Sequence, residues 1–188
     1  MTISIDDPRM LAPQCTSLKP VVTVHENQWF ALRNRGGYYT IEYHRPQVVV
    51  LPVVDNHSIV MVKVKRPVIN DIPLELPAGA AQEGENPITA AARELQEEAG
   101  IIISQSDRFQ LLPSIVISSS RYPILSWIYQ INISKQEFDL RDPHDEEIVN
   151  VECIPFEEVK RKIICSEIYI GWAVAVLSRF LFSRNELK

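Results

Sequence analysis

The chain has 188 residues, of which 46% are hydrophobic and 23% are charged, an ordinary balance for a folded domain that can bury a core without disulfides. Its formal net charge is −5 and it has no cluster of Lys and Arg, which argues against a nucleic-acid binder held by counterion release. It contains no run of 18 apolar residues, and the acidic start at Asp6 and Asp7 is unlike a signal peptide, so we expect a cytoplasmic protein without a membrane segment.

The cysteines agree with this location. There are three, Cys15, Cys153 and Cys165, an odd number without the C-x-x-C spacing of a metal or redox site. We expect three reduced thiols, as in a cytosolic protein.

The N-terminal part of the chain predicts a small β-structure. Residues 1–20 are rich in proline and show little periodicity, so we expect a loose N-terminal arm. Residues 29–33 and 38–44 are β-rich and are separated by the glycine pair at 36–37, which predicts a hairpin.

Two stronger strands follow, at residues 47–54 and 58–65. Asp55 and Asn56 between them are typical turn residues. Beyond the central helix discussed below, the sequence predicts further elements in this order: strands at 109–118 and 125–134, an acidic loop at 141–147, a strand at 148–154, a short helix at 155–162 and an apolar helix at 170–182. Strands outnumber helices and the helices lie between and after them, which predicts an α/β (α+β) sandwich.

The most informative element is a predicted helix over residues 87–99. Asn86 is a suitable N-cap, Pro87 stands at the first helical position, where its missing N–H costs nothing, and Gly100 follows as a C-terminal glycine. At about 100° per residue, one face of this helix is apolar and a second face gathers Glu94, Glu97 and Glu98.

Three carboxylates on one helical arc repel one another, because like charges at i,i+4 are destabilising by about 0.2–0.5 kcal/mol. Glu97 and Glu98 also lie in the last turn, where the helix dipole disfavours anions. A hard divalent cation converts both penalties into binding, and Mg²⁺ prefers carboxylate oxygens and bridges to phosphates. A bound cation also explains how an acidic chain handles a phosphate compound.

The surrounding sequence has a specific spacing. It follows the pattern G-x5-E-x7-R-E-U-x-E-E-x-G-U, where U is aliphatic. The matching residues are Gly79, Glu85, Arg93, Glu94, Leu95, Glu97, Glu98, Gly100 and Ile101. This segment resembles the Nudix box of the Nudix hydrolases.

The resemblance implies an α/β/α sandwich built on a mixed β-sheet. It also implies Mg²⁺, or alternatively Mn²⁺, as the cofactor. By position, Glu94, Glu97 and Glu98 are the expected metal ligands and catalytic carboxylates, the carbonyl of Ala78 is a further ligand, and Glu97 is a candidate general base.

The remaining positions of the pattern have supporting roles by the same resemblance. Arg93 is expected to orient the glutamates, and Glu85 to support the loop or bind an outer water of the metal. Gly79 is expected to let the main chain pass close to the metal.

The residues before the box narrow the resemblance. Residues 75–79 read E-L-P-A-G and look like the entry to the box of ADP-ribose and ADP-sugar diphosphatases. Those enzymes exchange an N-terminal β-domain in a homodimer. The resemblance therefore implies three parts: an arm at 1–20, a β-hairpin and dimerisation region at 21–46, and a Nudix hydrolase domain at 47–188.

Three further site residues are expected. The acidic loop resembles a late catalytic loop of these enzymes, and we expect Glu146 to activate water or to complete a metal site. Arg66 matches a position that contacts phosphate. Trp29 is a candidate for stacking on a nucleobase, across a dimer interface, and packing of its ring in the core or in the interface stays open as the alternative.

The function implied is metal-dependent hydrolysis of a nucleoside-diphosphate sugar, with ADP-ribose as the leading substrate and AMP and a sugar phosphate as products. The partner is thus a small molecule, with neither nucleic acid nor membrane involved. A proline that ADP-ribose enzymes often carry beyond the box has no match at Pro113 or Pro123, so GDP-mannose and other nucleotide sugars stay open. A non-catalytic nucleotide sensor and a nucleoside-triphosphate pyrophosphatase stay open as well.

Overall fold

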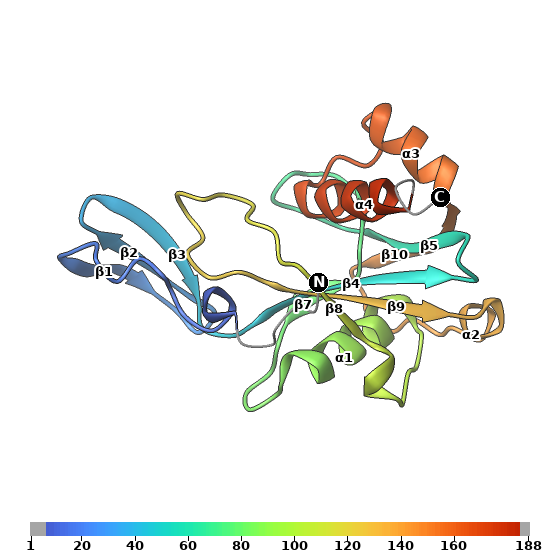
Figure 1. The fold of residues 1–188 in the computed structure, drawn as a ribbon, viewed down its shortest axis with the longest axis horizontal. Coiled ribbons are helices and arrows are strands. Elements are labelled where there is room, and N and C mark those ends of the chain that lie inside the picture. The colour runs from blue at the N-terminus through green and yellow to red at the C-terminus, as the bar shows by residue number, and fades with distance from the viewer. Residues whose placement is uncertain (1–6, 185–188) are drawn as a thin grey trace.

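Two sheets organise the chain in the computed structural model, which describes residues 7–184 (Figure 1). A small sheet near the N-terminus projects from one end of a larger layered body, at the left of the view.

The projecting sheet has three antiparallel strands, β1 (Val21–Glu26), β2 (Phe30–Arg35) and β3 (Tyr38–Tyr43), in that order. The glycines at 36 and 37 connect β2 to β3 with φ angles of 58° and 97°, and the predicted hairpin is confirmed. The sequence did not predict β1. Its side chains are mostly exposed, so no buried face imposes a strand pattern on it.

The larger sheet is mixed. Its order is β10-β5-β4-β9-β8, and only β4 and β9 run parallel. The strands are β4 (Gln47–Val54), β5 (Ser58–Val64), β8 (Gln110–Leu112), β9 (Trp127–Ile133) and β10 (Ile148–Pro155). The β4–β5 turn has positive φ at Asp55 and Asn56, as predicted. Two short strands complete the sheet: β6 (Leu74–Glu75) pairs with β5, and β7 (Ala78–Ala80) pairs with β4.

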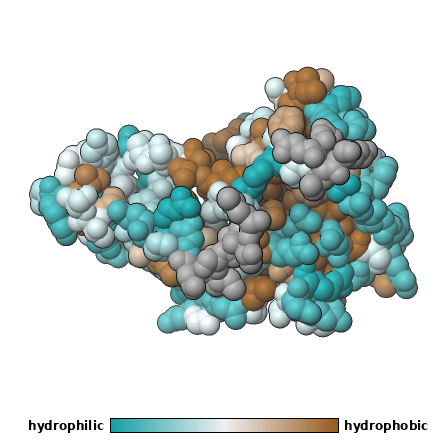
Figure 2. Space-filling view, in the orientation of Figure 1, coloured by the Kyte–Doolittle hydropathy of each residue, from teal (hydrophilic) through white to brown (hydrophobic). Residues whose placement is uncertain are grey.

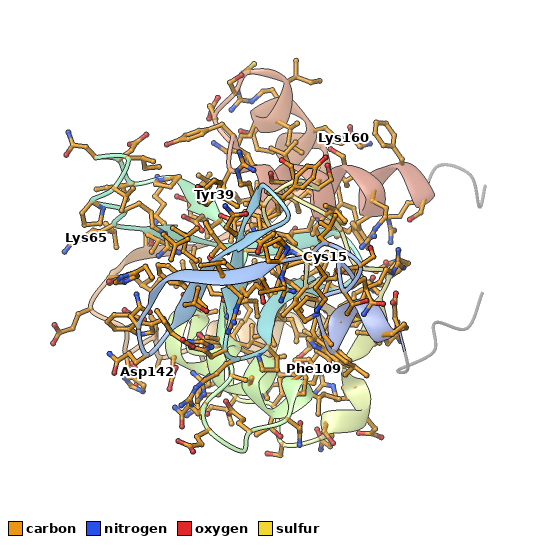
Figure 3. All side chains as sticks on the ribbon, turned by 90° about the vertical axis from the view of Figure 1, so that its left-hand side faces the viewer. Cys15, Tyr39, Lys65, Phe109, Asp142 and Lys160 are labelled. Carbon is orange, nitrogen blue, oxygen red and sulfur yellow. The ribbon has the colours of Figure 1, made fainter. Side chains whose placement is uncertain are left out.

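Helices cover both faces of this sheet. The helix α1 (Pro87–Ala99) lies on one face, and α3 (Phe156–Ile164) and α4 (Gly171–Ser183) lie on the other (Figure 1). The end-on view of Figure 3 shows Phe109 and Asp142 on the α1 side and Lys160 of α3 on the opposite side. Each interface has its own hydrophobic cluster, which confirms the expected α/β/α sandwich with a mixed sheet.

The strand predicted at residues 109–118 is much shorter in the structure. Residues 109–118 form only the short β8, because Pro113 has no N–H to continue the ladder, and residues 113–126 form a long loop. A short helix, α2 (Lys135–Asp139), was not predicted, although Ser134 and Glu137 form a complete capping box at its start.

Part of the expected loose arm is packed against the body. The short 3₁₀ helix at Pro8–Met10 buries the side chain of Met10, and the N–H of Leu125 donates a hydrogen bond to the carbonyl of Arg9 at 2.8 Å. Residues 1–6 of that arm lie outside the described part of the chain. Among the helices of residues 7–184, none is both long enough and apolar enough to cross a membrane.

Candidate active site

The helix α1 forms for local reasons. The Asn86 side chain caps its first turn by accepting a hydrogen bond from the N–H of Thr89 at 2.9 Å, and Pro87 opens it. Gly100 ends it with φ at 71°, the left-handed conformation that suits glycine. The predicted bounds and both caps are confirmed.

Two of its glutamates face the strand β7 and are buried. Glu94 is 7% exposed and Glu98 is 6% exposed. The N–H of Ala78 donates a hydrogen bond to Oε2 of Glu98 at 3.0 Å. A Cβ atom at Gly79 would lie 2.2 Å from Oε1 of Glu94, so only glycine leaves room for that carboxylate. The main chain of β7 and the two carboxylates therefore form one closely packed unit.

The surroundings disfavour negative charge on this pair. Burial raises the pKa of Glu98 to about 8, and the nearby Glu94 and Asp145 add to the rise, while the Ala78 amide and Arg66 oppose it. Burial also raises the pKa of Glu94, against the effect of Arg93. A cation bound between these carboxylates would restore their charged forms.

Arg93 is a cation that contacts several carboxylates of this site. Its guanidinium donates to Glu97 Oε2 at 2.7 Å and to Glu85 Oε2 at 3.1 Å. It also pairs with Glu94 Oε1 at 2.8 Å and donates to the carbonyl of Ala80 at 2.8 Å. Arg93 thus ties the helix to the preceding loop and fixes the direction of three carboxylates.

The acidic loop is attached to the C-terminal end of α1. The N–H groups of His144 and Asp145 donate to the carbonyl of Glu97 at 3.1 and 3.2 Å, and the N–H of Asp142 donates to the carbonyl of Gly100 at 2.9 Å. The late loop and the box helix are therefore one structure, although more than 40 residues separate them in sequence.

Among the carboxylates of this loop, that of Asp145 acts electrostatically on Glu98 of the box. Its charge raises the pKa of Glu98, whereas the side chain of Glu146, the residue expected from the sequence, is exposed. No spacing rule could have chosen between neighbouring acids in a loop, because the choice depends on how the loop docks.

Arg66 lies at the site and Trp29 does not. Arg66 donates to Glu75 at 2.8 and 3.1 Å, and its charge lowers the pKa of Glu98. Glu75 was noted in the sequence only as the first residue of the E-L-P-A-G run, and its hydrogen bonds to Arg66 were not expected. Trp29 is 64% exposed in the turn before β2.

A pocket of about 420 Å³ opens beside these groups. Its lining includes Tyr43, Arg66, Glu75, Gly79, Tyr122 and Trp172. The residues come from the end of β3, from the segment between β5 and β6, from β6 and β7, from the 113–126 loop and from the start of α4. Figure 2 shows hydrophobic surface in the hollow between the projecting sheet and the larger body.

The donor set suits a hard divalent cation. Within residues 7–184, no three Asp, Glu, His or Cys side chains converge as a ready coordination shell. Mg²⁺ does not require one, because it is usually held by one or two carboxylates together with waters and substrate phosphates. Glu94, Glu98 and the carbonyl of Ala78 are the donors that fit this description.

Three comparisons with known proteins agree with this geometry. The model of the NUDIX domain matches residues 43–168. A segment of 57 residues is 44% identical to the ADP-ribose pyrophosphatase of Bacillus subtilis (strain 168), and it covers 30% of this chain and 31% of that relative, so the match spans less than a third of the relative's length. The crystal structure of an ADP compounds hydrolase is similar over 88% of this chain and 90% of that chain, with a TM-score of 0.64 and 19% identity, which shows a shared fold.

Proposed function

This chain belongs to the Nudix family of hydrolases, and from that premise we propose that it cleaves the diphosphate bridge of a nucleoside-diphosphate sugar with a divalent cation, ADP-ribose being the leading substrate. The products would be AMP and a sugar phosphate. The observation that carries the proposal is the buried pair Glu94 and Glu98, packed against Ala78 and Gly79 at the edge of a pocket.

The proposed cofactor is Mg²⁺, with Mn²⁺ as the alternative. When bound, such an ion supplies positive charge that neutralises the diphosphate and stabilises the transition state. Glu94, Glu97, Glu98 and the Ala78 carbonyl are the proposed ligands, with Glu146 as a further one. Arg93 would keep Glu94 and Glu97 in place as substrate enters, because it already contacts both of them and is itself tied to Glu85.

The chemical step is attack of water on one phosphorus. A new O–P bond forms, the bridging P–O bond breaks, and the leaving phosphate takes the electron pair. A carboxylate must accept the proton of the attacking water, and the candidates are Glu97 in the box and Glu146 in the acidic loop. Asp145 joins them, because it is the loop acid that acts on Glu98. Arg66, which Glu75 holds beside the box, would contact a phosphate oxygen in this proposal.

The proposed assembly is a homodimer formed through the projecting sheet. β1 is an outer strand of that sheet, and Val22 and Val24 on it are each 53% exposed. An outer strand with apolar side chains is a surface on which a second sheet can pair. Trp29, exposed in the same region, would reach substrate only in a partner's site. The expected cytoplasmic location stays a prediction.

A substrate panel tests the proposal. Purified protein is incubated with ADP-ribose, ADP-glucose, GDP-mannose, NADH, diadenosine phosphates or nucleoside triphosphates, each with Mg²⁺, Mn²⁺ or EDTA. We expect phosphomonoester release from ADP-ribose that requires metal. Faster cleavage of GDP-mannose or of triphosphates would identify the competing substrate class, and binding of ADP-ribose without cleavage would favour a sensor.

A further inference from the structure

The lining of the pocket beside the box has two parts of different character. One part is Ala78 and Gly79, which contact the buried carboxylates, together with the Arg66–Glu75 pair. The rest of the lining is mostly apolar and aromatic. A substrate whose diphosphate sits at the first part would place one of its two other groups against the second part.

Much of the apolar part belongs to the 113–126 loop, and this loop is held at both its base and its tip. At the base, the Ser114 hydroxyl donates to the carbonyl of Ser126 at 2.6 Å. At the tip, the N–H of Ile41 in β3 donates to the carbonyl of Arg121 at 2.8 Å. The loop is therefore shaped before substrate arrives, which lowers the entropic cost of binding.

Aromatic rings belong to this part of the lining. The rings of Tyr43 and Tyr122 are parallel within 2°, with centroids 6.1 Å apart, and both line the pocket. Trp172, at the start of α4, lines it as well. Ile115, Val116 and Ile117 contribute aliphatic side chains from the same loop.

This lining suits a planar base better than a sugar. A sugar hydroxyl that enters an apolar pocket must find a hydrogen-bond partner or lose the free energy of its hydration. A nucleobase gains from stacking on aromatic rings and from burial against aliphatic side chains. The volume of about 420 Å³ also lies within the range of small-molecule sites.

We propose that the pocket between the 113–126 loop, Tyr43 and Trp172 binds the nucleobase of the substrate, with Tyr122 as the residue on which the base stacks. This rests on the proposed function for the identity of the ligand. It places the base within one protomer, in contrast to stacking on Trp29 across a dimer. The order along the pocket is then base, ribose, diphosphate beside Arg66, and the carboxylates of the box.

Binding of AMP in EDTA tests this assignment without any turnover. Calorimetry would compare AMP with ribose 5-phosphate on the wild-type protein. We expect AMP to bind at least tenfold more tightly, because only AMP carries a base. Failure of AMP to bind at millimolar concentrations, or equal binding of ribose 5-phosphate, would overturn the proposal.

Variants then locate the base. Tyr122→Ala should weaken AMP binding about tenfold, the usual effect of removing one base-stacking ring, whereas Tyr122→Phe should keep the affinity. Val116→Asn, at a half-exposed position of the 113–126 loop, should weaken it too and guards against misfolding of Tyr122→Ala. Phe182→Ala, an exposed aromatic on α4, is the matched control and should change nothing.

The same set separates this proposal from the proposed hydrolysis. If Trp29→Ala weakens AMP binding while Tyr122→Ala and Val116→Asn leave it unchanged, the base lies at Trp29 and the pocket assignment fails, whatever the activity. If AMP binds at Tyr122 but no diphosphate compound is cleaved, the proposed function fails and the pocket assignment holds.

Discussion

The main-chain N–H of Ala78 donates a hydrogen bond to the Glu98 carboxylate at 3.0 Å, which joins β7 to the far end of the box helix. Since Glu98 is 6% exposed, this contact holds its side chain against the strand, where the carbonyl of the same Ala78 is also a candidate ligand. The hydrogen bond thus fixes the Glu98 side chain beside β7. The first prediction concerns this carboxylate and its neighbour Glu97.

Replacing the carboxylates should remove activity and leave the fold intact. Glu98→Gln and Glu97→Gln each keep side-chain size but lose a negative oxygen, and we expect turnover to fall by about a hundredfold or more, as for a lost transition-state interaction. Initial rates and melting temperatures would be measured together. Glu83→Gln is the control, because the Glu83 side chain is 93% exposed in the loop before the helix. Near-wild-type rates in both box variants would remove the proposed chemistry.

Gly79→Ala should damage the site more than the fold. The new Cβ would lie 2.2 Å from Oε1 of Glu94, and a side-chain carboxylate can move aside at little cost. We therefore expect activity to drop strongly while the melting temperature changes little. Gly171→Ala, where a Cβ would meet nothing within 4 Å, is the matched control. A large loss of stability with normal specific activity in Gly79→Ala would contradict this account.

Gly100→Ala should instead destabilise the protein. Gly100 has φ at 71°, and a Cβ would lie 2.3 Å from the main-chain nitrogen of Asp142, which cannot shift as a side chain does. We expect the free energy of unfolding to fall by about 1–3 kcal/mol or more, from strain and from displacement of the acidic loop. Urea denaturation measures this.

Gly84→Ala measures the loss of stability caused by a positive φ angle alone, without a steric clash. Gly84 has a similar φ of 74°, but a Cβ there would meet nothing within 4 Å. The difference between the two variants is the cost of the clash with the loop. Equal losses of stability would show that the loop does not dock on Gly100 as described.

Acid should weaken the attachment of α2 to the residues before β8. The hydrogen bonds from Arg108 lower the pKa of Glu137 from 4.5 to about 2, with help from Ser134. Because the folded-state pKa is depressed, this stability is fully present above the unfolded value and is lost as the pH falls from about 5 to about 2. The Arg108–Glu137 pair is partly exposed, so we expect the free energy of unfolding to change by only about 0.5–1 kcal/mol.

Urea midpoints at pH 6 and pH 3 would show this effect. Glu137→Gln should lower stability at pH 6 and reduce the difference between the two pH values, whereas Glu157→Gln, at an exposed position of α3, should leave that difference unchanged. An unchanged difference in Glu137→Gln would assign the acid sensitivity to other groups.

The box could be predicted from sequence because its information is local. The cap at Asn86, the glycine at 100 and the 3.6-residue period lie within one short segment, and they determine both the helix and the face that carries the glutamates. The capping box of Ser134 and Glu137 has the same local character, and it was available in the sequence although α2 was not predicted.

Other features depended on contacts between distant segments. The β-prone residues on both sides of Pro113 predicted a strand over 109–118, but only residues 110–112 of this segment pair with β9. Further along the same loop, Arg121 accepts a hydrogen bond from Ile41 of β3. Glu146 and Asp145 are neighbouring acids in the same loop, and the sequence gives no reason to prefer one of them as a site residue. They differ only in how the docking of the loop onto Glu97 orients them.

Short-range hydrogen bonding and helical geometry are enough to specify the box helix, its caps and the acidic side chains on one face, so the residues alone could predict them. Three other relationships emerge only when the layers pack: Glu94 and Glu98 are buried against β7, Arg66 turns to Glu75, and Tyr43 meets Tyr122 to wall the pocket. These relationships join residues 9 to 79 positions apart, and they arise from sheet pairing and layer packing, which no local pattern records.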